Sequence, residues 1–370
     1  MSQEKPFTRT KVLILSDTHG MTLAGKTPSQ LVDVAIHCGD LTEESKLDEF
    51  RATLELLNTI EAPLKLVIAG NHDFTLDAVS FRKKVEEATR QQLEPELISA
   101  VYGEYDEARC LLTDAKKDGI HFLDEGKHRF SLQNGTKLAI FASPFTPSLG
   151  DGGFQYTPDQ GHVFDIERGT DIVVTHGPPR GILDRTNSRE RAGCSDLFMA
   201  VARAKPQVHC FGHIHEGWGA KMVTWRETLA EKPSHLTDID NNKSFIVEQL
   251  STLQKSKFDT PEDMKEKHDK VNKYTDQKFC CISHCHGDTA VLEVGKQTLF
   301  VNASIKGDED MPIQLPWLVK LDLPKADAED EVVDAQGASK TALGKNRVLD
   351  EEKDFVEEPS PKQRRLGGHV

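Results

Sequence analysis

Five short runs of apolar and β-branched residues, each followed at once by a polar turn, constrain the fold of this chain more than any other feature. With a hyphen at each turn, they read VLILS-DTHG, VAIHCG-D, KLVIAG-NHD, DIVVT-HG and VHCFG-HIH. Polar, helix-favouring stretches separate them. Continuous apolar runs are typical of strands buried on both faces, so the pattern predicts an α/β protein.

One helix can be placed from the spacing of its apolar residues. They recur at three- and four-residue steps, at Leu47, Phe50, Leu54, Leu57 and Ile60. This spacing predicts a helix that lies on a sheet, with these side chains in the core.

The composition changes after Trp225. Residues 226–296 are rich in Lys, Asp and Glu, and they predict a charged helical insertion. Within it we expect helices near Phe245–Lys255 and Pro261–Tyr274.

Strand-like sequence returns after this insertion, at residues 298–305 and 319–323. Residues 10–225 and 297–323 are therefore expected to form one domain. Residues 324–370 are acidic and poor in apolar side chains, which predicts a disordered acidic tail.

Potential metal ligands stand in the turn after each of the five runs. In an open α/β sheet, ligands bind outside the carboxyl ends of the strands, so these side chains should converge on one crevice. They are Asp17, His19, Asp40, Asn71, His176, His213 and His215. Mixed nitrogen and oxygen donors suit first-row divalent ions, and seven ligands are too many for one tetrahedral zinc. The set predicts two ions that share a carboxylate, drawn from Mn²⁺, Fe²⁺/Fe³⁺ or Zn²⁺.

Two adjacent cations predict chemistry on phosphate esters. They can bind the non-bridging oxygens of a phosphoryl group, and a water that bridges them is deprotonated near neutral pH and becomes a nucleophile. The leaving oxygen then needs a proton. His72 directly follows Asn71 and is the candidate catalytic residue, because an imidazole can act as a general acid near neutral pH.

In type and order, these motifs resemble those of the calcineurin-like metallophosphoesterase superfamily. The superfamily pattern is DxH, GD, GNH(D/E), an isolated His and GHxH; this chain has Asp17-Thr18-His19, Gly39-Asp40, Gly70-Asn71-His72-Asp73, His176 and Gly212-His213-Ile214-His215. The resemblance implies a four-layer αββα sandwich of two mixed β-sheets flanked by helices. It also implies one metal held by Asp17, His19, Asp40 and His215, and a second held by Asp40, Asn71, His176 and His213. Asp40 would bridge the two.

Longer stretches resemble the metallophosphoesterase-domain-containing proteins, which look like class III cyclic-nucleotide phosphodiesterases. The stretches are SPFTPSLGDGGFQY (143–156), THGPPRGILD (175–184), RAGCSDL (191–197) and HCFGHIHEGWG (209–219). The resemblance implies a phosphodiesterase that acts on a small or cyclic nucleotide-type substrate. Residues 221–297 depart from the family pattern, which joins the flanking parts by a short turn.

Other functions stay open. A catalytically weak metal-binding scaffold or regulator would use the same ligands, although the presence of all seven and of His72 favours an enzyme. A phosphomonoesterase or protein phosphatase would also use two metals. However, the Arg-containing turn that follows GD in protein phosphatases is replaced here by Leu41-Thr42-Glu43-Glu44. The formal net charge of -14 disfavours a long nucleic acid as partner.

Two further groups of His and Cys residues have alternative interpretations. His37 and His209 lie inside apolar runs and are expected to be structural, because metal ligands should stand at strand ends. The sequence CCISHCHG (280–287) allows a separate zinc clip, but its spacing matches no common zinc module, so a partly buried loop is favoured.

Two features near the ligands are candidates for substrate binding. The Pro- and Gly-rich segment Ser143–Tyr156 either lines the substrate pocket or only turns a corner. Four arginines follow His176 and can hold a phosphate, with solvent exposure as the alternative for at least two of them: Arg180, Arg185, Arg189 and Arg191.

The cysteine count and the first residues predict a cytoplasmic location. Seven cysteines, an odd number, and a start that lacks an apolar core indicate a reduced intracellular protein. No apolar run approaches the ~20 residues needed to span a bilayer, so we expect no membrane segment. The sequence does not constrain the oligomeric state.

Overall fold

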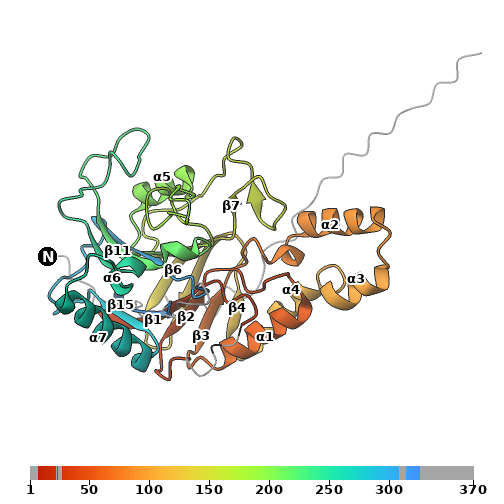
Figure 1. Ribbon diagram of the computed structural model, residues 1–370, viewed down its shortest axis with the longest axis horizontal. Helices are drawn as coiled ribbons and strands as arrows, with labels where there is room; N and C mark the ends of the chain where they lie inside the picture. The colour runs from red at the N-terminus through yellow and green to blue at the C-terminus, as the bar shows by residue number, and fades with distance from the viewer. Residues whose placement is uncertain (1–6, 22, 24–26, 308–313, 326–370) are drawn as a thin grey trace, which may run out of the picture. The chain divides into compact units, whose positions relative to one another are not determined.

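The strands assemble into two large mixed sheets (Figure 1). The computed structural model describes residues 7–21, 23, 27–307 and 314–325. The first sheet has the order β13-β15-β1-β2-β3-β4, formed by Cys280–Ser283, Trp317–Pro324, Phe7–Leu15, Val34–His37, Leu64–Val67 and Ile120–Phe122. The second has the order β12-β11-β14-β10-β9-β6-β5, formed by Phe245–Gln249, Gly219–Thr224, Gln297–Asn302, Val208–Phe211, Ile172–Thr175, Lys137–Ser143 and Gly126–Ser131. A separate pair joins β7 (Thr146–Pro147) to β8 (Gln155–Tyr156).

Each sheet has a parallel centre. Strands β1, β2, β3 and β4 are parallel neighbours in the first sheet, and β6, β9, β10 and β14 are parallel neighbours in the second. The antiparallel strands lie outside these centres, where β15 pairs with β1, β11 with β14, and β5 with β6. The parallel centres matter for function, because the strands in each centre end at the same edge of their sheet.

The side chains of the central strands alternate between two cores. Val12 and Ile14 of β1 share one core with Ile172 and Val174 of β9, so this core lies between the two sheets. The side chains that alternate with these along each strand point to the outer face of their sheet. Leu13 packs in a core with Phe50 of α1 (Leu47–Asn58), and Val173 packs in a third core with Val201 of α5 (Ser195–Ala204). The four layers are therefore helix, sheet, sheet and helix, which confirms the predicted αββα sandwich.

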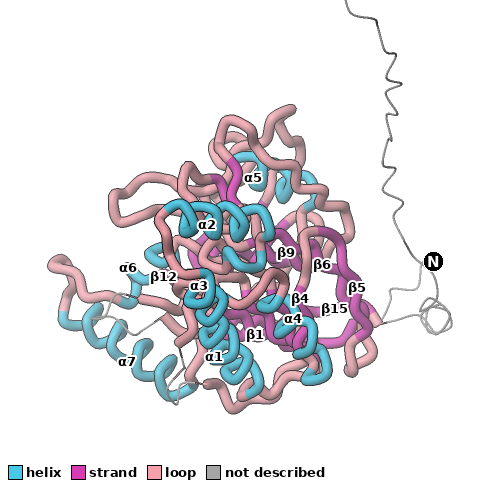
Figure 2. Tube along the Cα trace, turned by 90° about the vertical axis from the view of Figure 1, so that its right-hand side faces the viewer, coloured by secondary structure: helices cyan, strands magenta, loops and turns pink. Residues whose placement is uncertain are grey.

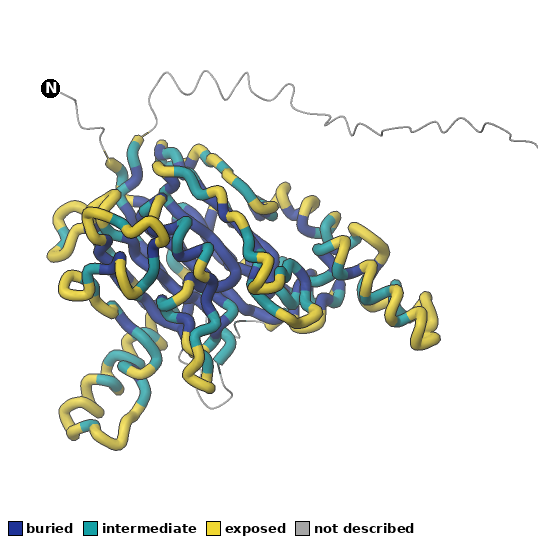
Figure 3. The backbone as a smooth tube through the Cα atoms, turned by 90° about the horizontal axis from the view of Figure 1, so that it is seen from above, coloured by how far each residue is buried: buried dark blue, intermediate teal, exposed yellow. Residues whose placement is uncertain are grey.

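Helices α1 and α5 cover the outer faces of the two sheets, whereas α6 and α7 pack against the core between them. Besides α1 and α5, the described helices are α2 (Ala78–Arg90), α3 (Pro95–Tyr102), α4 (Glu107–Asp114), α6 (Leu250–Leu253), α7 (Pro261–Gln277), and the 3₁₀ turns η1 (Phe74–Leu76), η2 (Ala115–Asp118) and η3 (His215–Gly217). Helices α1, α3 and α4 gather on one side of the strands (Figure 2). Neither α3 nor α7 has a fully buried residue. Figure 3 shows a buried interior with exposed segments projecting from it.

The helix predicted from apolar spacing is present as α1. Leu47, Phe50, Leu57 and Ile60 are buried, as expected, and Leu54 is partly buried against the same core. The acidic side chain of Glu49 accepts a 3.0 Å hydrogen bond from the amide of Lys46, which caps the helix start.

Two parts of the charged helical insertion predicted at residues 226–296 differ from what was expected. Phe245–Gln249 is strand β12, paired with β11, and only Leu250–Leu253 of the predicted helix is helical. The start of the Cys-rich segment forms strand β13 beside β15, where a loop was expected. Bulky and β-branched residues such as Ile246 and Val247 favour a strand wherever a sheet edge is available to pair with. The second predicted helix is present as α7, with Pro261 at its first position.

The two returning strands belong to different sheets. The strand-like sequences expected to return after the insertion are present, with β14 inside the second sheet and β15 inside the first. Pro324 still belongs to β15, and Lys325 forms a bridge with Thr136, so these two residues are not part of a tail. Residues 326–370 of the predicted tail lie outside the described residues. Within the described part of the chain, no helix is both long and apolar enough to cross a membrane.

Candidate metal centre

The turns after five parallel strands bring the seven predicted ligands together. Asp17 and His19 follow β1, Asp40 follows β2, and Asn71 follows β3; His176 follows β9, and His213 and His215 follow β10. Their side chains form two groups whose ligand atoms lie within 4.8 Å of one another, Asp17-His19-His215 and Asp40-His176-His213. Asn71 joins the second group. The predicted convergence at one edge of the two sheets is therefore observed.

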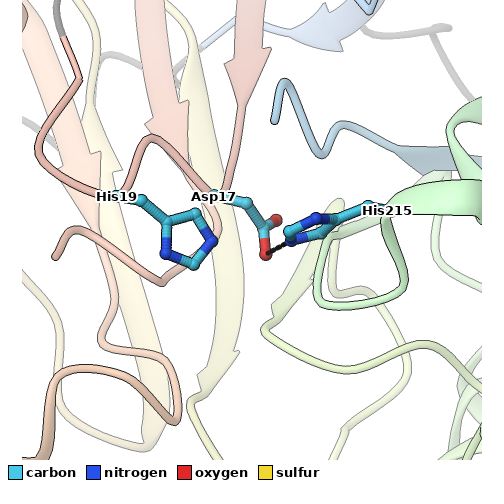
Figure 4. A group of neighbouring side chains, drawn as sticks. All are labelled: Asp17, His19 and His215. Carbon is cyan, nitrogen blue, oxygen red and sulfur yellow. Dashed lines mark hydrogen bonds and ion pairs between the residues drawn. The ribbon is translucent and has the colours of Figure 1, made fainter. Parts of the chain in front are cut away.

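The first group is centred on the carboxylate of Asp17 (Figure 4). Its Oδ1 lies 3.2 Å from Nε2 of His215, and the amide of His213 donates to both carboxylate oxygens at 3.1 Å. The ring of His19 stands on the other side, 5.4 Å from the ring of His215 between centroids. Asp17 thus lies between imidazoles supplied by opposite sheets.

The second group is centred on the ring of His176. Its Nε2 lies 2.9 Å from Oδ1 of Asn71 and 3.3 Å from Oδ2 of Asp40. Its Nδ1 donates to the carbonyl of Cys38 at 3.0 Å, because a carbonyl oxygen can only accept. This bond fixes the ring and points the other nitrogen at the ligand cluster, as is usual for metal-binding histidines.

The backbone at the centre is strained. Four of the seven residues have positive φ angles although none is glycine: Asp17 at 56°, His19 at 48°, Asp40 at 52° and His213 at 67°. Each such conformation costs on the order of 1–3 kcal/mol and tends to occur at functional sites, where the surrounding structure enforces it. The fold holds these four side chains in place at the expense of stability.

Two glycines allow the strand ends to approach this closely. A Cβ atom on Gly70 would lie 2.3 Å from Oδ1 of Asp40, and one on Gly212 would lie 2.0 Å from Oδ2 of Asp17. The neighbours in both cases are ligand carboxylates held in a packed core. No larger residue fits at these two positions without displacing them.

The buried charges favour a cation at the centre. Burial lowers the pKa of His19 and of His213 to about 4 in each case, which keeps their lone pairs free. Burial acts in the opposite sense on Asp40, but the neighbouring His176 outweighs it and lowers the pKa of that carboxyl to about 2. For His176, burial lowers the pKa, whereas Asp40 and Asp17 raise it to about 9. Carboxylates that attract a proton to this position would also attract a metal ion, which competes with the proton for the same nitrogen.

The surroundings of His19 are a further reason to expect a metal ion at this centre. Both ring nitrogens of His19 are buried without a hydrogen-bond partner. A carboxylate oxygen of Glu43 lies 3.1 Å from Nδ1, but not in a direction that makes a hydrogen bond. Buried polar atoms are rarely left unpaired, and a metal ion on one nitrogen would remove part of this cost.

His72 stands beside the two ligand groups and belongs to neither. Its ring is 4.8 Å from that of His19, its Nδ1 lies 2.6 Å from the carbonyl of Glu43, and its amide donates to Oδ1 of Asp40 at 2.9 Å. A third cluster of potential ligands, His19-Glu43-His72, overlaps the first group. The side chain is only partly buried, so a substrate can reach it.

Sequence reasoning missed four residues that lie at or beside the centre. Ser304 donates a 2.8 Å hydrogen bond to Oδ2 of Asp17. Asp73 accepts from the amides of Gly70 (2.8 Å) and Leu41 (3.1 Å); burial, followed by the charge of Asp40, raises the pKa of Asp73 to about 7. Glu43 pairs with Lys306 next to His19. Asp73 stands in the GNHD motif and was open to inference, whereas no local signal marks Ser304 or Lys306.

The two histidines expected to be structural have structural partners. Nε2 of His37 lies 2.9 Å from the hydroxyl of Thr18, and Nε2 of His209 lies 2.8 Å from that of Thr175. Burial lowers the pKa of both rings to about 3, so they remain neutral. Each lies behind a turn that carries a ligand.

The zinc alternative for the Cys-rich segment has no support in the described chain. Among the described residues, the groups able to hold a metal ion do not include Cys280, Cys281, His284, Cys285 or His286. The thiols of Cys280 and Cys285 are buried, and burial raises the pKa of both.

The candidate arginines do not join the described ligand groups. Arg191 pairs with the buried Asp184 at 2.7 Å, and Arg180 donates to the carbonyl of Arg191 at 3.5 Å. Arg185 and Arg189 are exposed, which fits the alternative of solvent-facing side chains. Assignment of a phosphate to any of the four remains a prediction.

Comparisons with known proteins identify a family and several relatives. The family model described as "Calcineurin-like phosphoesterase" matches residues 10–217. "Metallophosphoesterase domain-containing protein 1" from Homo sapiens is 33% identical over 225 residues, covering 58% of this chain and 63% of that protein. "Probable rhamnogalacturonate lyase C" from Emericella nidulans is 33% identical over 218 residues, covering 58% of this chain and 18% of that protein. The chain therefore spans less than two thirds of the length of either relative.

A solved structure, purple acid phosphatase PPD1 from yellow lupin (Lupinus luteus) seeds, is also similar. It is 13% identical, with a TM-score of 0.30, over 60% of this chain and 40% of the phosphatase chain.

Proposed function

Because the chain belongs to the calcineurin-like phosphoesterase family, we propose that it is a metal-dependent phosphodiesterase that acts on small or cyclic nucleotide-type substrates. The seven-residue centre would hold two first-row divalent ions, Mn²⁺, Fe²⁺/Fe³⁺ or Zn²⁺. The observation that carries the proposal is the meeting of two ligand groups at one carboxylate. Oδ2 of Asp40 lies 3.9 Å from Nε2 of His19 and 3.3 Å from Nε2 of His176.

The proposed ligand assignment follows from these neighbours. Asp17, His19 and His215 would hold one ion; Asn71, His176 and His213 would hold the other; and Asp40 would be shared. When bound, two such ions would polarise the phosphoryl oxygens and lower the pKa of the attacking water. The strained backbone at four of the ligands supports the assignment, since strain of this kind is retained where function needs it.

His72 is the proposed catalytic residue. The carbonyl of Glu43 holds its Nδ1–H at 2.6 Å, which leaves Nε2 to give a proton to the leaving oxygen of the substrate. The hydrogen bond that its backbone amide donates to Oδ1 of Asp40 keeps this acid next to the shared carboxylate. His72 would therefore act on the leaving group, while the ligand residues orient the phosphate.

The proposed setting is the cytoplasm, with a small substrate as the partner. All seven cysteines are free thiols, as in a reducing compartment. The net charge of -14 works against a long polyanionic substrate.

The proposal is tested by reconstituting metal-free protein with Mn²⁺, Fe²⁺ or Zn²⁺ and measuring turnover of bis-p-nitrophenyl and p-nitrophenyl phosphate. We expect metal-dependent turnover of both esters, with a higher kcat/KM for the diester than for the monoester. In a second assay we expect the metal-loaded protein to hydrolyse cyclic nucleotides. Turnover of the monoester alone would indicate a phosphomonoesterase. Two bound metals without turnover of either ester would indicate a scaffold.

A further inference from the structure

A cavity of about 560 Å³ opens beside His72, and Asn71 is the one proposed metal ligand among its described lining residues. It lies within the range of roughly 300–1,000 Å³ that is usual for small-molecule sites. Asn71, His72 and Glu43 form one side of it, and most of the other lining residues belong to helices α2 and α3 and to the loop at residues 150–155. The cavity therefore begins where the candidate acid stands and extends away from the metal centre.

The wall of the cavity is aromatic. Phe74, Phe81 and Tyr102 all line it, and they form one cluster, because the ring of Phe74 lies 6.4 Å from Phe81 and 5.7 Å from Tyr102. Phe74 directly follows the GNHD turn, so the cluster is attached to the same segment as His72. Such a surface favours a flat ring that can stack on it.

The described lining of the cavity offers an anionic occupant no Lys or Arg that is not already paired. Its described lining carries three carboxylates, on Glu43, Glu44 and Asp151, and a single Lys or Arg side chain, Lys84. Lys84 is already paired with Asp151 at 2.9 Å and lies over the ring of Phe74. Glu43 and Glu44 pair with Lys306 and Lys46, which are not lining residues. A neutral ring is therefore preferred over a group that carries further phosphates.

The cavity keeps its shape through bonds between α2 and the Ser143–Tyr156 loop. Asp77, the cap of α2, accepts from the amide of Phe154 at 2.9 Å, and the amide of Gly153 donates to the carbonyl of Asn71 at 2.8 Å. The loop is thus tied both to the helix and to a proposed ligand. This supports the interpretation of the loop as part of the substrate site.

We infer that this cavity is the leaving-group subsite and that it binds a neutral aromatic ring, such as the base of a nucleoside, against Phe74 and Tyr102. The inference rests on the proposed function, because His72 can protonate only an oxygen on its own side of the phosphorus. In the reaction, the oxygen of water bonds to phosphorus and water gives up a proton, while the bond from phosphorus to the nucleoside oxygen breaks and that oxygen takes a proton from His72. The proton given up by water replaces, through solvent, the one that His72 has lost. The nucleoside then leaves through the cavity.

The methyl ester of adenosine 5′-monophosphate tests this inference by internal competition. Hydrolysis can release adenosine with methyl phosphate, or methanol with adenosine monophosphate, and both leaving alcohols are primary. Phosphorus NMR of the initial products gives the ratio directly, and metal loading cancels from it. We expect adenosine to leave about tenfold more often, the order of preference that stacking of one base supplies.

Two variants change the cavity in different ways. Tyr102→Ala removes one stacking ring, and Ala88→Trp fills the space from α2; both should bring the ratio close to one. The control is Phe258→Ala, which removes an aromatic ring that is 82% exposed and lies in the loop before α7. It should leave the ratio unchanged. Melting curves show whether each variant is folded. If one of the two cavity variants does not fold, the product ratio of the other one tests the inference.

The outcomes separate this inference from the function on which it rests. Hydrolysis by the parent protein with a ratio near one, or a ratio that neither cavity variant changes, overturns the subsite and leaves the phosphodiesterase standing. No hydrolysis by protein that contains two metals contradicts the proposed function, and the subsite falls with it.

Discussion

The hydroxyl of Ser304 donates a 2.8 Å hydrogen bond to Oδ2 of Asp17, which stands 287 positions earlier in the chain. Ser304 follows β14, and Asp17 follows β1, so the bond joins the ends of strands from different sheets. The same carboxylate also accepts from the amide of His213. The second half of the domain therefore completes the orientation of the first proposed ligand.

Ser304→Ala should lower metal affinity by about 10- to 100-fold, the usual effect of removing a partner that orients a ligand. The folded structure should persist, because only one hydroxyl is lost. Calorimetric titration of the metal-free protein with metal measures the change in affinity. Ser256→Ala, at an exposed serine next to α7, is the matched control. Equal affinities for the two variants would show that Ser304 does not position Asp17.

Asp40→Ala should remove most of both ions, because its carboxylate faces imidazoles of both ligand groups. Elemental analysis of the parent protein should find close to two first-row divalent ions per chain. The control is Asp48→Ala, which removes a carboxylate that is 92% exposed and pairs only with Arg51 among its described partners. Full metal content in Asp40→Ala would contradict the shared position.

The insertion should contribute to the stability of the whole fold. Ile282 of β13 is 4% exposed and lies in the core between the sheets. Ile282→Ala should therefore lower the free energy of unfolding by roughly 2–5 kcal/mol, as for other buried large-to-small changes. Urea unfolding measures the loss, and Ile246→Ala, on the exposed side of β12, is the control with little expected effect. A separate unfolding transition for the insertion, with the main one unchanged, would show that Ile282 does not stabilise the sheets.

The sequence was sufficient for features whose signal is local. Each proposed ligand stands within four residues of the end of an apolar run, and the parallel centres of the two sheets bring those ends together. The α1 helix also followed from spacing alone. In both cases the pattern and the tertiary structure agree.

Features that depend on distant partners could not be predicted. Ile246 and Val247 form a strand because β11 offers an unpaired edge. The residues next to them in the sequence give no sign of that edge. Ser304 and Lys306 reach the centre from beyond the insertion, and their neighbours in sequence do not mark them. The aromatic cavity could not be predicted for the same reason, because its lining comes from α2, α3 and the Ser143–Tyr156 loop, which lie apart in the sequence.

His72→Ala should slow turnover of substrates with poor leaving groups far more than turnover of substrates with good ones. An alkoxide that leaves from a nucleotide needs a proton in the transition state, and loss of a general acid costs roughly 10²- to 10⁴-fold in rate. A p-nitrophenolate leaves without that help, so its ester should lose much less. Metal content should hardly change, because His72 is not a ligand in this mechanism.

The competing explanation is that His72 only supports the GNHD turn, through its 2.6 Å contact with the Glu43 carbonyl. In that case both substrate classes should slow equally, and metal content or melting temperature should fall as well. His72→Gln retains a side-chain donor for that carbonyl but cannot deliver a proton, so it separates support from acid catalysis. If His72→Gln restores stability yet keeps the selective loss on nucleotide esters, His72 is the acid. Equal losses on the two classes, measured on one metal-quantified preparation, would exclude that role.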